Sequence, residues 1–133
     1  AAQTAADRDV ILCIEPLRAA ETNFITSAEQ ADLFVHDVGQ PNVGFMLDVK
    51  AAFMMPKGVE GTFKLFAPRA RHVHVNQPDG KAPGMGDFDF KLVFDILAAA
   101  RYDRWVSVEP FDYKPDPETV ARTAYHTLKH TME

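Results

Sequence analysis

RHVHVNQPDGKAPGMGDFDF, residues 71–90, contains a short strand pattern, a loop rich in Gly, Pro and Asp, and the start of an apolar helical run. Histidine and valine alternate in HVHV (72–75), which predicts a β-strand with both imidazoles on one face. The strand therefore brings two histidines to the start of a flexible-looking loop. If this end of the strand belongs to a site, the other strands of the chain are expected to end in comparable side chains.

The same strand-then-helix order recurs along the whole chain. VILCIEPL (10–17) is a continuous aliphatic run, as expected of a strand buried on both faces of a parallel sheet. Ser27, Asp89 and Pro117 stand where helices are expected to begin. Strict alternation of four strands with four helices predicts an α/β fold with a parallel sheet and right-handed crossovers. The expected strands are 10–17, 43–49, 72–75 and 104–111, and the expected helices are 26–39, 58–70 (weakly patterned, because glycine and proline interrupt it), 89–100 and 116–132.

Composition and charge narrow the class of protein. With 133 residues, 47% of them hydrophobic, the chain has the size of one globular domain, which we expect to span residues 1–133. The net charge of −5 is spread without a basic run, which argues against nucleic acid or an anionic membrane as a partner. The apolar stretches are too short to cross a bilayer, and the N-terminus lacks a signal-peptide pattern. The single cysteine, Cys13, excludes a disulfide framework and favours a packing role in a reducing cytoplasm.

The four expected strands share one feature at their carboxyl ends. Each stops at an acidic or imidazole side chain, and these are Glu15, Asp48, His74 and Glu109. Such groups are good ligands for hard or borderline divalent metals. One acid at a strand end is usually the start of a solvated loop, but the same feature on all four strands is harder to dismiss. Because parallel strands bring these ends to one face of the sheet, we predict that the four residues form a metal site.

The remaining histidines are weaker ligand candidates. His72 lies two residues before His74, farther from the carboxyl end of the strand, and we expect it to pack or to make supporting hydrogen bonds. His36, His126 and His130 fall within expected helices and are interpreted as surface or packing residues.

Five segments of the chain together resemble a known family. They are IEPL with ETNF, PNVGFMLDV, HVHVNQPDGKAPGMGDFDF and WVSVEPFDY. The combination resembles the sugar isomerase/epimerase family with the xylose-isomerase-like TIM barrel, whose members include ketose 3-epimerases, hydroxypyruvate isomerases and inosose dehydratases. The resemblance runs from about Val10 to the last helix. A full (β/α)₈ barrel needs about 250 residues, so we expect strands five to eight, the C-terminal half of a barrel.

The resemblance also implies a site and a reaction. A divalent ion (Mn²⁺, Mg²⁺, Co²⁺ or Zn²⁺) would be held by the four strand-end residues, with Glu15 and Glu109 doubling as the acid/base pair and Glu21 near the substrate. The implied activity is isomerisation or epimerisation of a sugar or sugar phosphate. A proton beside the carbonyl would be removed, and the metal would stabilise the resulting enediolate.

Two departures from the family affect substrate contacts. Many members place a substrate-contacting histidine three positions after the aspartate, where this chain has Ala51 with Lys50 beside it. The loop after His74 contains no arginine, which epimerase-type members tend to have there. We expect substrate contacts from Lys50, Asn76 and Lys81; Lys50 would suit a phosphate or carboxylate group, although a lysine in this position is often simply solvated.

Other functions fit the same residues. A half-barrel whose ligands are inherited but idle would be a non-catalytic interaction module. An inosose dehydratase-like lyase, or a metal-dependent hydrolase such as an abasic-site endonuclease, would use the same ligand types, although the charge does not suit a DNA-acting enzyme. A half-barrel also leaves two sheet edges and the inward-facing aliphatic side chains of its strands exposed. We therefore expect the isolated chain to be inactive, and either to associate, for example as a homo-oligomer that pairs two halves, or to remain poorly folded.

Overall fold

The computed structural model describes residues 1–133, and its central element is a four-stranded parallel sheet in the order β1-β2-β3-β4. The predicted α/β fold with alternating strands and helices is confirmed. The elements in chain order are α1 (Ala2–Ala6), β1 (Leu12–Ile14), α2 (Ala28–Val38), β2 (Val43–Asp48), α3 (Val49–Phe53), α4 (Gly58–Phe66), β3 (His72–Val75), α5 (Lys91–Ala99), β4 (Val106–Val108) and α6 (Pro117–Met132).

Local sequence explains where the helices begin. Ser27 caps α2, because its hydroxyl accepts a hydrogen bond from the backbone N–H of Gln30. Asp116 caps α6 in the same manner and is followed by Pro117 in the first turn. The helix α5 begins at Lys91, after Phe90, which makes no side-chain cap. The expected cap Asp89 stands just before Phe90, and its Oδ1 accepts a hydrogen bond from the backbone N–H of Lys91 at 2.9 Å. The short helix α3, directly after β2, is not visible as a separate pattern in the sequence.

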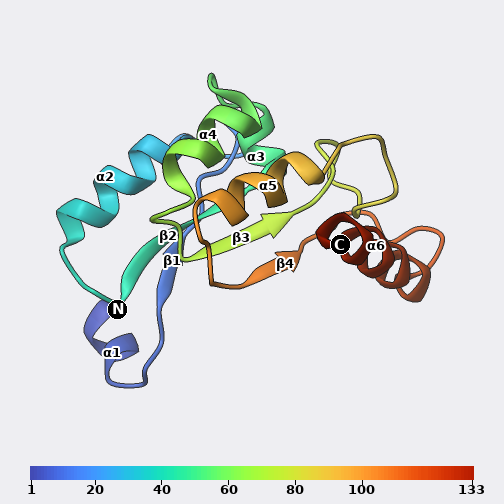
Figure 1. Ribbon diagram of the computed structural model, residues 1–133. Helices are drawn as coiled ribbons and strands as arrows, with labels where there is room; N and C mark the ends of the chain where they lie inside the picture. The colour runs from blue at the N-terminus through green and yellow to red at the C-terminus, as the bar shows by residue number, and fades with distance from the viewer.

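The two faces of the sheet differ in chemistry. Helices α2, α4 and α5 lie together on one side of the sheet, whereas its other face is uncovered (Figure 1). On the helix side, Phe45, Leu47, Val73 and Val75 are buried in the main hydrophobic core, and Phe45 makes an edge-to-face contact with Phe66 of α4.

The expectation that aliphatic strand residues face the open side is therefore wrong. Because side chains alternate along a strand, the positions between these core residues face the other way. The uncovered face carries mostly polar side chains, and its positions are Cys13, Glu15, Gly44, Met46, Asp48, His72, His74, Ser107 and Glu109.

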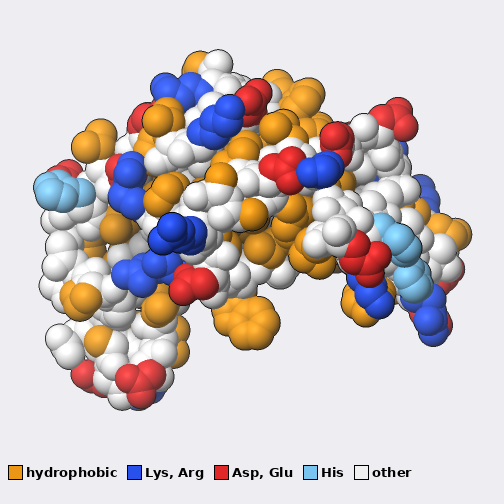
Figure 2. Space-filling model, in the orientation of Figure 1, with side chains coloured by type: hydrophobic (Ala, Val, Ile, Leu, Met, Phe, Trp, Pro, Cys, Tyr) orange, Lys and Arg blue, Asp and Glu red, His pale blue; other side chains and the backbone are white.

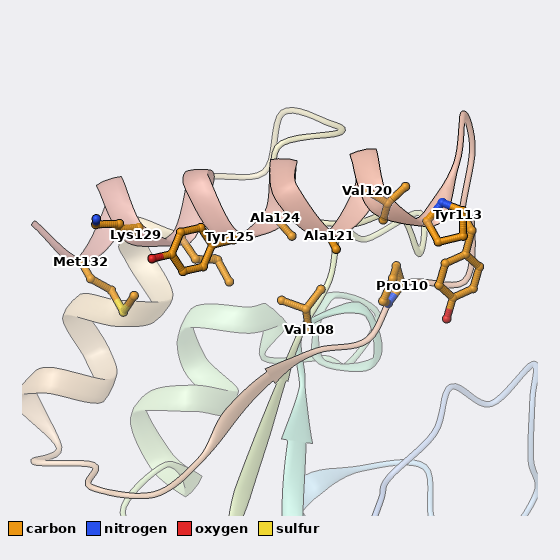
Figure 3. A pocket seen from close by; sticks show the side chains of 11 residues that line it. Val108, Pro110, Tyr113, Val120, Ala121, Ala124, Tyr125, Lys129 and Met132 are labelled. Carbon is orange, nitrogen blue, oxygen red and sulfur yellow. The ribbon is translucent and has the colours of Figure 1, made fainter.

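An apolar groove runs beneath α6, beside the unpaired edge of β4. Figure 3 shows Val108 of β4 facing Ala121 and Ala124 of α6, with Tyr125 farther along the helix. The groove has a volume of about 640 Å³ and eight of its eleven lining residues are hydrophobic. This edge of the sheet thus offers an apolar surface as well as unpaired backbone groups.

Charged side chains of both signs intermingle over the surface shown in Figure 2. The even distribution agrees with the absence of a basic run in the sequence. None of the helices combines the length and the hydropathy that crossing a membrane requires.

Candidate metal centre and substrate pocket

The four strand-end residues converge at one point of the sheet. One ligand atom from each of Glu15, Asp48, His74 and Glu109, hereafter the tetrad, lies within 4.8 Å of the others. The strand register explains the convergence, since Asp48 pairs with His74 across β2 and β3, and β1 and β4 flank them. All four strands run parallel, so their carboxyl ends meet on one side of the sheet.

Asp48 is the most firmly held member of the tetrad. Its side chain is the N-cap of α3 and Asp48 is only 4% exposed. The backbone N–H of Ala51 donates to Asp48 Oδ1 at 2.7 Å, and Asn76 Nδ2 donates to Asp48 Oδ2, also at 2.7 Å. These two bonds fix the plane of the carboxylate and leave further lone pairs free for a ligand.

Asn76, an expected substrate contact, is instead fully buried. Its Oδ1 accepts a hydrogen bond from the backbone N–H of Lys50 at 2.9 Å. Its Nδ2 donates to Asp48 and also to the backbone carbonyl of Glu109 at 3.2 Å. The amide thus joins the ends of β2, β3 and β4, and each of its polar atoms already has a protein partner.

His74 carries a buried nitrogen with no hydrogen-bond partner. Its Nδ1 lies 3.1 Å from Glu109 Oε2 and 3.6 Å from Glu15 Oε1, yet neither contact has hydrogen-bond geometry. The neighbouring His72 stacks edge-to-face on His74, and its Nε2 lies 2.6 Å from the hydroxyl of Ser107. His72 therefore supports the ring of His74, as expected.

The tetrad concentrates negative charge at low exposure. Burial raises the pKa of Asp48 and of Glu109, and in both cases neighbouring carboxylates add to the effect. Burial opposes protonation of His74, but the three carboxylates of the tetrad outweigh it, so the pKa of this imidazole is raised. The three shifts reflect the burial of Asp48 and Glu109 and the closeness of the carboxylates to one another and to His74.

A divalent metal ion fits this arrangement. Ligands at opposite sides of such an ion lie about 4.0–4.6 Å apart, twice a metal–ligand bond of about 2.0–2.3 Å. The ligand atoms of the tetrad all lie within 4.8 Å of one another, which is compatible with that span. The unpartnered Nδ1 of His74 and the repulsion among the carboxylates are two further features that a bound cation would relieve.

A cavity of about 220 Å³ opens beside the tetrad. Lys50 reaches into the cavity from the start of α3, and its side chain is only 8% exposed. Its Nζ lies 3.0 Å from Glu21 Oε1 and 4.0 Å from the centre of the Phe111 ring. Glu21 is in turn held by Arg18 through bonds of 2.7 and 3.0 Å. The lining residues are Glu15, Leu17, Glu21, Asp48, Lys50, Ala51, Glu109 and Phe111.

Of the four expected substrate contacts, the structure places Glu21 and Lys50 in the cavity wall. Lys81 lies outside this cavity, where it pairs with Asp79 at 2.6 Å. Two residues beside the cavity, Arg18 and Phe111, were not predicted from the sequence. Arg18 carried a usable signal, since it stands three residues before Glu21 in the same loop.

Comparison with known proteins identifies the family. A family model described as xylose isomerase-like TIM barrel matches residues 1–131. The chain belongs to this family. It is 27% identical over 121 residues to the L-ribulose 3-epimerase of Mesorhizobium japonicum, and the matched region covers 91% of this chain and 41% of that protein. It is also 27% identical over 116 residues to the hydroxypyruvate isomerase of Escherichia coli, with coverages of 85% and 44%.

The fold agrees with that of a solved family member. A structure of L-ribulose 3-epimerase superposes with a TM-score of 0.89 at 24% identity, over 98% of this chain and 50% of that chain. The chain spans less than half the length of the curated relatives it matches. The prediction that its four strand–helix units correspond to half of a TIM barrel is therefore confirmed.

Proposed function

We propose that this xylose isomerase-like protein is a metal-dependent isomerase or epimerase that moves a proton beside the carbonyl group of a small sugar. Its relatives are sugar isomerases and epimerases, which supports this class of reaction. The observation that carries the proposal is the placement of two glutamates, Glu15 from the end of β1 and Glu109 from the end of β4, on either side of His74.

The placement of the two glutamates supports a role in proton transfer. Removing a proton beside a carbonyl produces a planar enediolate, and a carboxylate on each face allows one to take the proton and the other to return it. A divalent ion held by the tetrad would supply positive charge that stabilises the developing negative charge. Burial raises the pKa of Glu109, which makes its carboxylate a stronger base.

The surrounding residues hold these groups in place. Asn76 fixes Asp48 and the backbone at Glu109, so it orients two members of the tetrad at once. Leu17 and Phe111 add apolar surface to the wall of the cavity.

The test is exchange of the substrate α-proton with solvent deuterium, followed by NMR on the metal-loaded protein with the complete barrel reconstituted. The compounds are free ketoses, sugar phosphates and hydroxypyruvate. Glu15→Gln and Glu109→Gln should each lower the exchange rate by at least about 100-fold, the usual contribution of a general base. The control is Glu60→Gln, which removes an exposed carboxylate paired only with Lys64 and should leave the rate unchanged.

Metal affinity is measured on the same variants by calorimetry, because both glutamates are also proposed ligands. The proposal requires the loss of exchange to persist at saturating metal. Full exchange by either variant under that condition would show that the glutamate is not a base.

A further inference from the structure

The two cations beside the substrate cavity, Lys50 and Arg18, are both paired with the carboxylate of Glu21. Lys50 is the only lysine or arginine in its lining, and its ammonium lies 3.0 Å from the carboxylate of Glu21. Arg18, immediately behind, makes a bidentate pair with the same carboxylate at 2.7 and 3.0 Å. The arrangement differs from a phosphate or carboxylate subsite, where a lysine or arginine is left free to bind the anion.

The Glu21 carboxylate remains ionised over the whole physiological range. Hydrogen bonds from Arg18, and secondarily from Lys50, lower its pKa to about 2. The ammonium of Lys50 is also covered on another side by the ring of Phe111, 4.0 Å from the ring centre. Of the three N–H donors of an ammonium group, this leaves one for a neutral oxygen such as a sugar hydroxyl.

Charges around the cavity balance once a divalent ion is included. The three carboxylates of the tetrad exceed a divalent cation by one negative charge. The cluster of Glu21, Lys50 and Arg18 carries one net positive charge, which cancels it. An uncharged substrate would keep the site neutral, whereas a phosphate or carboxylate would introduce uncompensated negative charge next to Glu15 and Glu109.

Resting on the proposed function, we infer that the site takes an uncharged hydroxy-carbonyl compound, a free ketose, and discriminates against phosphorylated and carboxylated analogues. Lys50 is the specificity-determining residue. Its ammonium is held by Glu21, donates a hydrogen bond to a substrate hydroxyl and does not serve as a binding site for anions. The inference separates this chain from the chemistry named for its hydroxypyruvate isomerase relatives, because hydroxypyruvate is an anion.

Binding of matched ligands to the metal-loaded protein tests the inference directly. Calorimetry would compare D-fructose and D-tagatose with their 6-phosphates and with hydroxypyruvate. At least one free ketose should bind, and its 6-phosphate should bind about tenfold more weakly or worse, because it adds unpaired charge to the site. The inference is overturned if neither ketose binds, or if a phosphate or hydroxypyruvate binds as tightly as the free sugars.

Two charge variants test the role of the cluster with opposite signs. Glu21→Gln frees Lys50 and Arg18 and should raise the affinity for the 6-phosphates by about tenfold, a gain that high salt should weaken. Lys50→Met removes the positive charge and should lower the affinity for both the phosphates and the free ketose. Glu60→Gln, a change of the same kind on the exposed face of α4, should change neither. Equal effects of Glu21→Gln on phosphorylated and free sugars would refute the charge argument.

The failure of this inference and the failure of the proposed function give different results. Preferred binding of a free ketose without α-proton exchange would leave this inference standing and refute the proposed function. Exchange observed with a sugar phosphate in preference to the free sugar would do the reverse.

Discussion

Replacing Asn76 with alanine should weaken both the fold and the metal site, because one buried amide makes three hydrogen bonds at the strand ends. The Lys50 N–H would lose its acceptor, and a buried backbone group left unpaired costs about 1–3 kcal/mol. Asp48 would lose a charged hydrogen bond worth about 1.5–3 kcal/mol. Because the two share one environment, we expect a combined loss of about 3 kcal/mol, which lowers the Tm by about 10 °C for a domain of this size.

The same substitution should lower metal affinity by about 10–100-fold, the usual effect of removing a residue that orients a ligand. Urea unfolding in the presence of a chelator measures the first effect, and calorimetry with Mn²⁺ measures the second. The matched control is Asn42→Ala, whose side chain donates to the carbonyls of Ala2 and Val10 at the opposite end of the sheet. It should cost stability and leave metal affinity unchanged. If Asn76→Ala loses stability but binds Mn²⁺ like the unaltered protein, the orienting role is refuted.

Two further predictions concern the backbone and pH. Gly84→Ala should destabilise the protein by about 1 kcal/mol more than Gly58→Ala, as measured by urea unfolding. Both glycines have a positive φ, but only at Gly84 would the new methyl group collide with other side chains, those of Thr127 and Thr123. Equal losses of stability in the two variants would contradict this. In chelator, thermal stability should fall as pH rises from about 4 to 8, since the raised pKa values of Asp48, Glu109 and His74 mean that the folded state binds more protons than the unfolded chain. The gain in thermal stability on adding Mn²⁺ should increase as pH rises over the same range, because the ion competes with those protons for the ligands. If thermal stability has the same pH dependence in chelator and in Mn²⁺, that result would count against a metal at the tetrad.

The sequence was most informative about the strand ends. A short-range pattern, an aliphatic run that stops at an acid or imidazole, is sufficient to find all four members of the tetrad, because parallel strands carry such ends to one place. Strand lengths were less predictable: the first strand is ordered over Leu12–Ile14, although the aliphatic run is longer. Edge strands have a partner on one side only, so their ends depend on tertiary pairing that composition does not report.

The roles of Asn76 and Lys50 could not be predicted for a different reason. Asn76 follows a strand and is polar, which is also the pattern of a loop residue that contacts substrate. Its partners are the backbone of Lys50, 26 residues away, and that of Glu109, 33 residues away. Likewise the neutralisation of Lys50 depends on Glu21, from the loop after another strand. Such contacts arise from the fold and leave no periodic trace in the sequence.

The packing of the helix side of the sheet determines the chemistry of the other side. In β2 and β3, the core residues Phe45, Leu47, Val73 and Val75 alternate with the residues of the uncovered face of the sheet. Each large apolar side chain gains about 1.5–3 kcal/mol from burial, so the four together contribute an amount comparable with the total stability of about 5–15 kcal/mol expected for a small domain. A slip of one residue would turn this set toward the open face and bury the histidines and Asp48 in the core. The hydrophobic core therefore enforces the register on which the tetrad depends, and the cluster of carboxylates can persist despite its mutual repulsion.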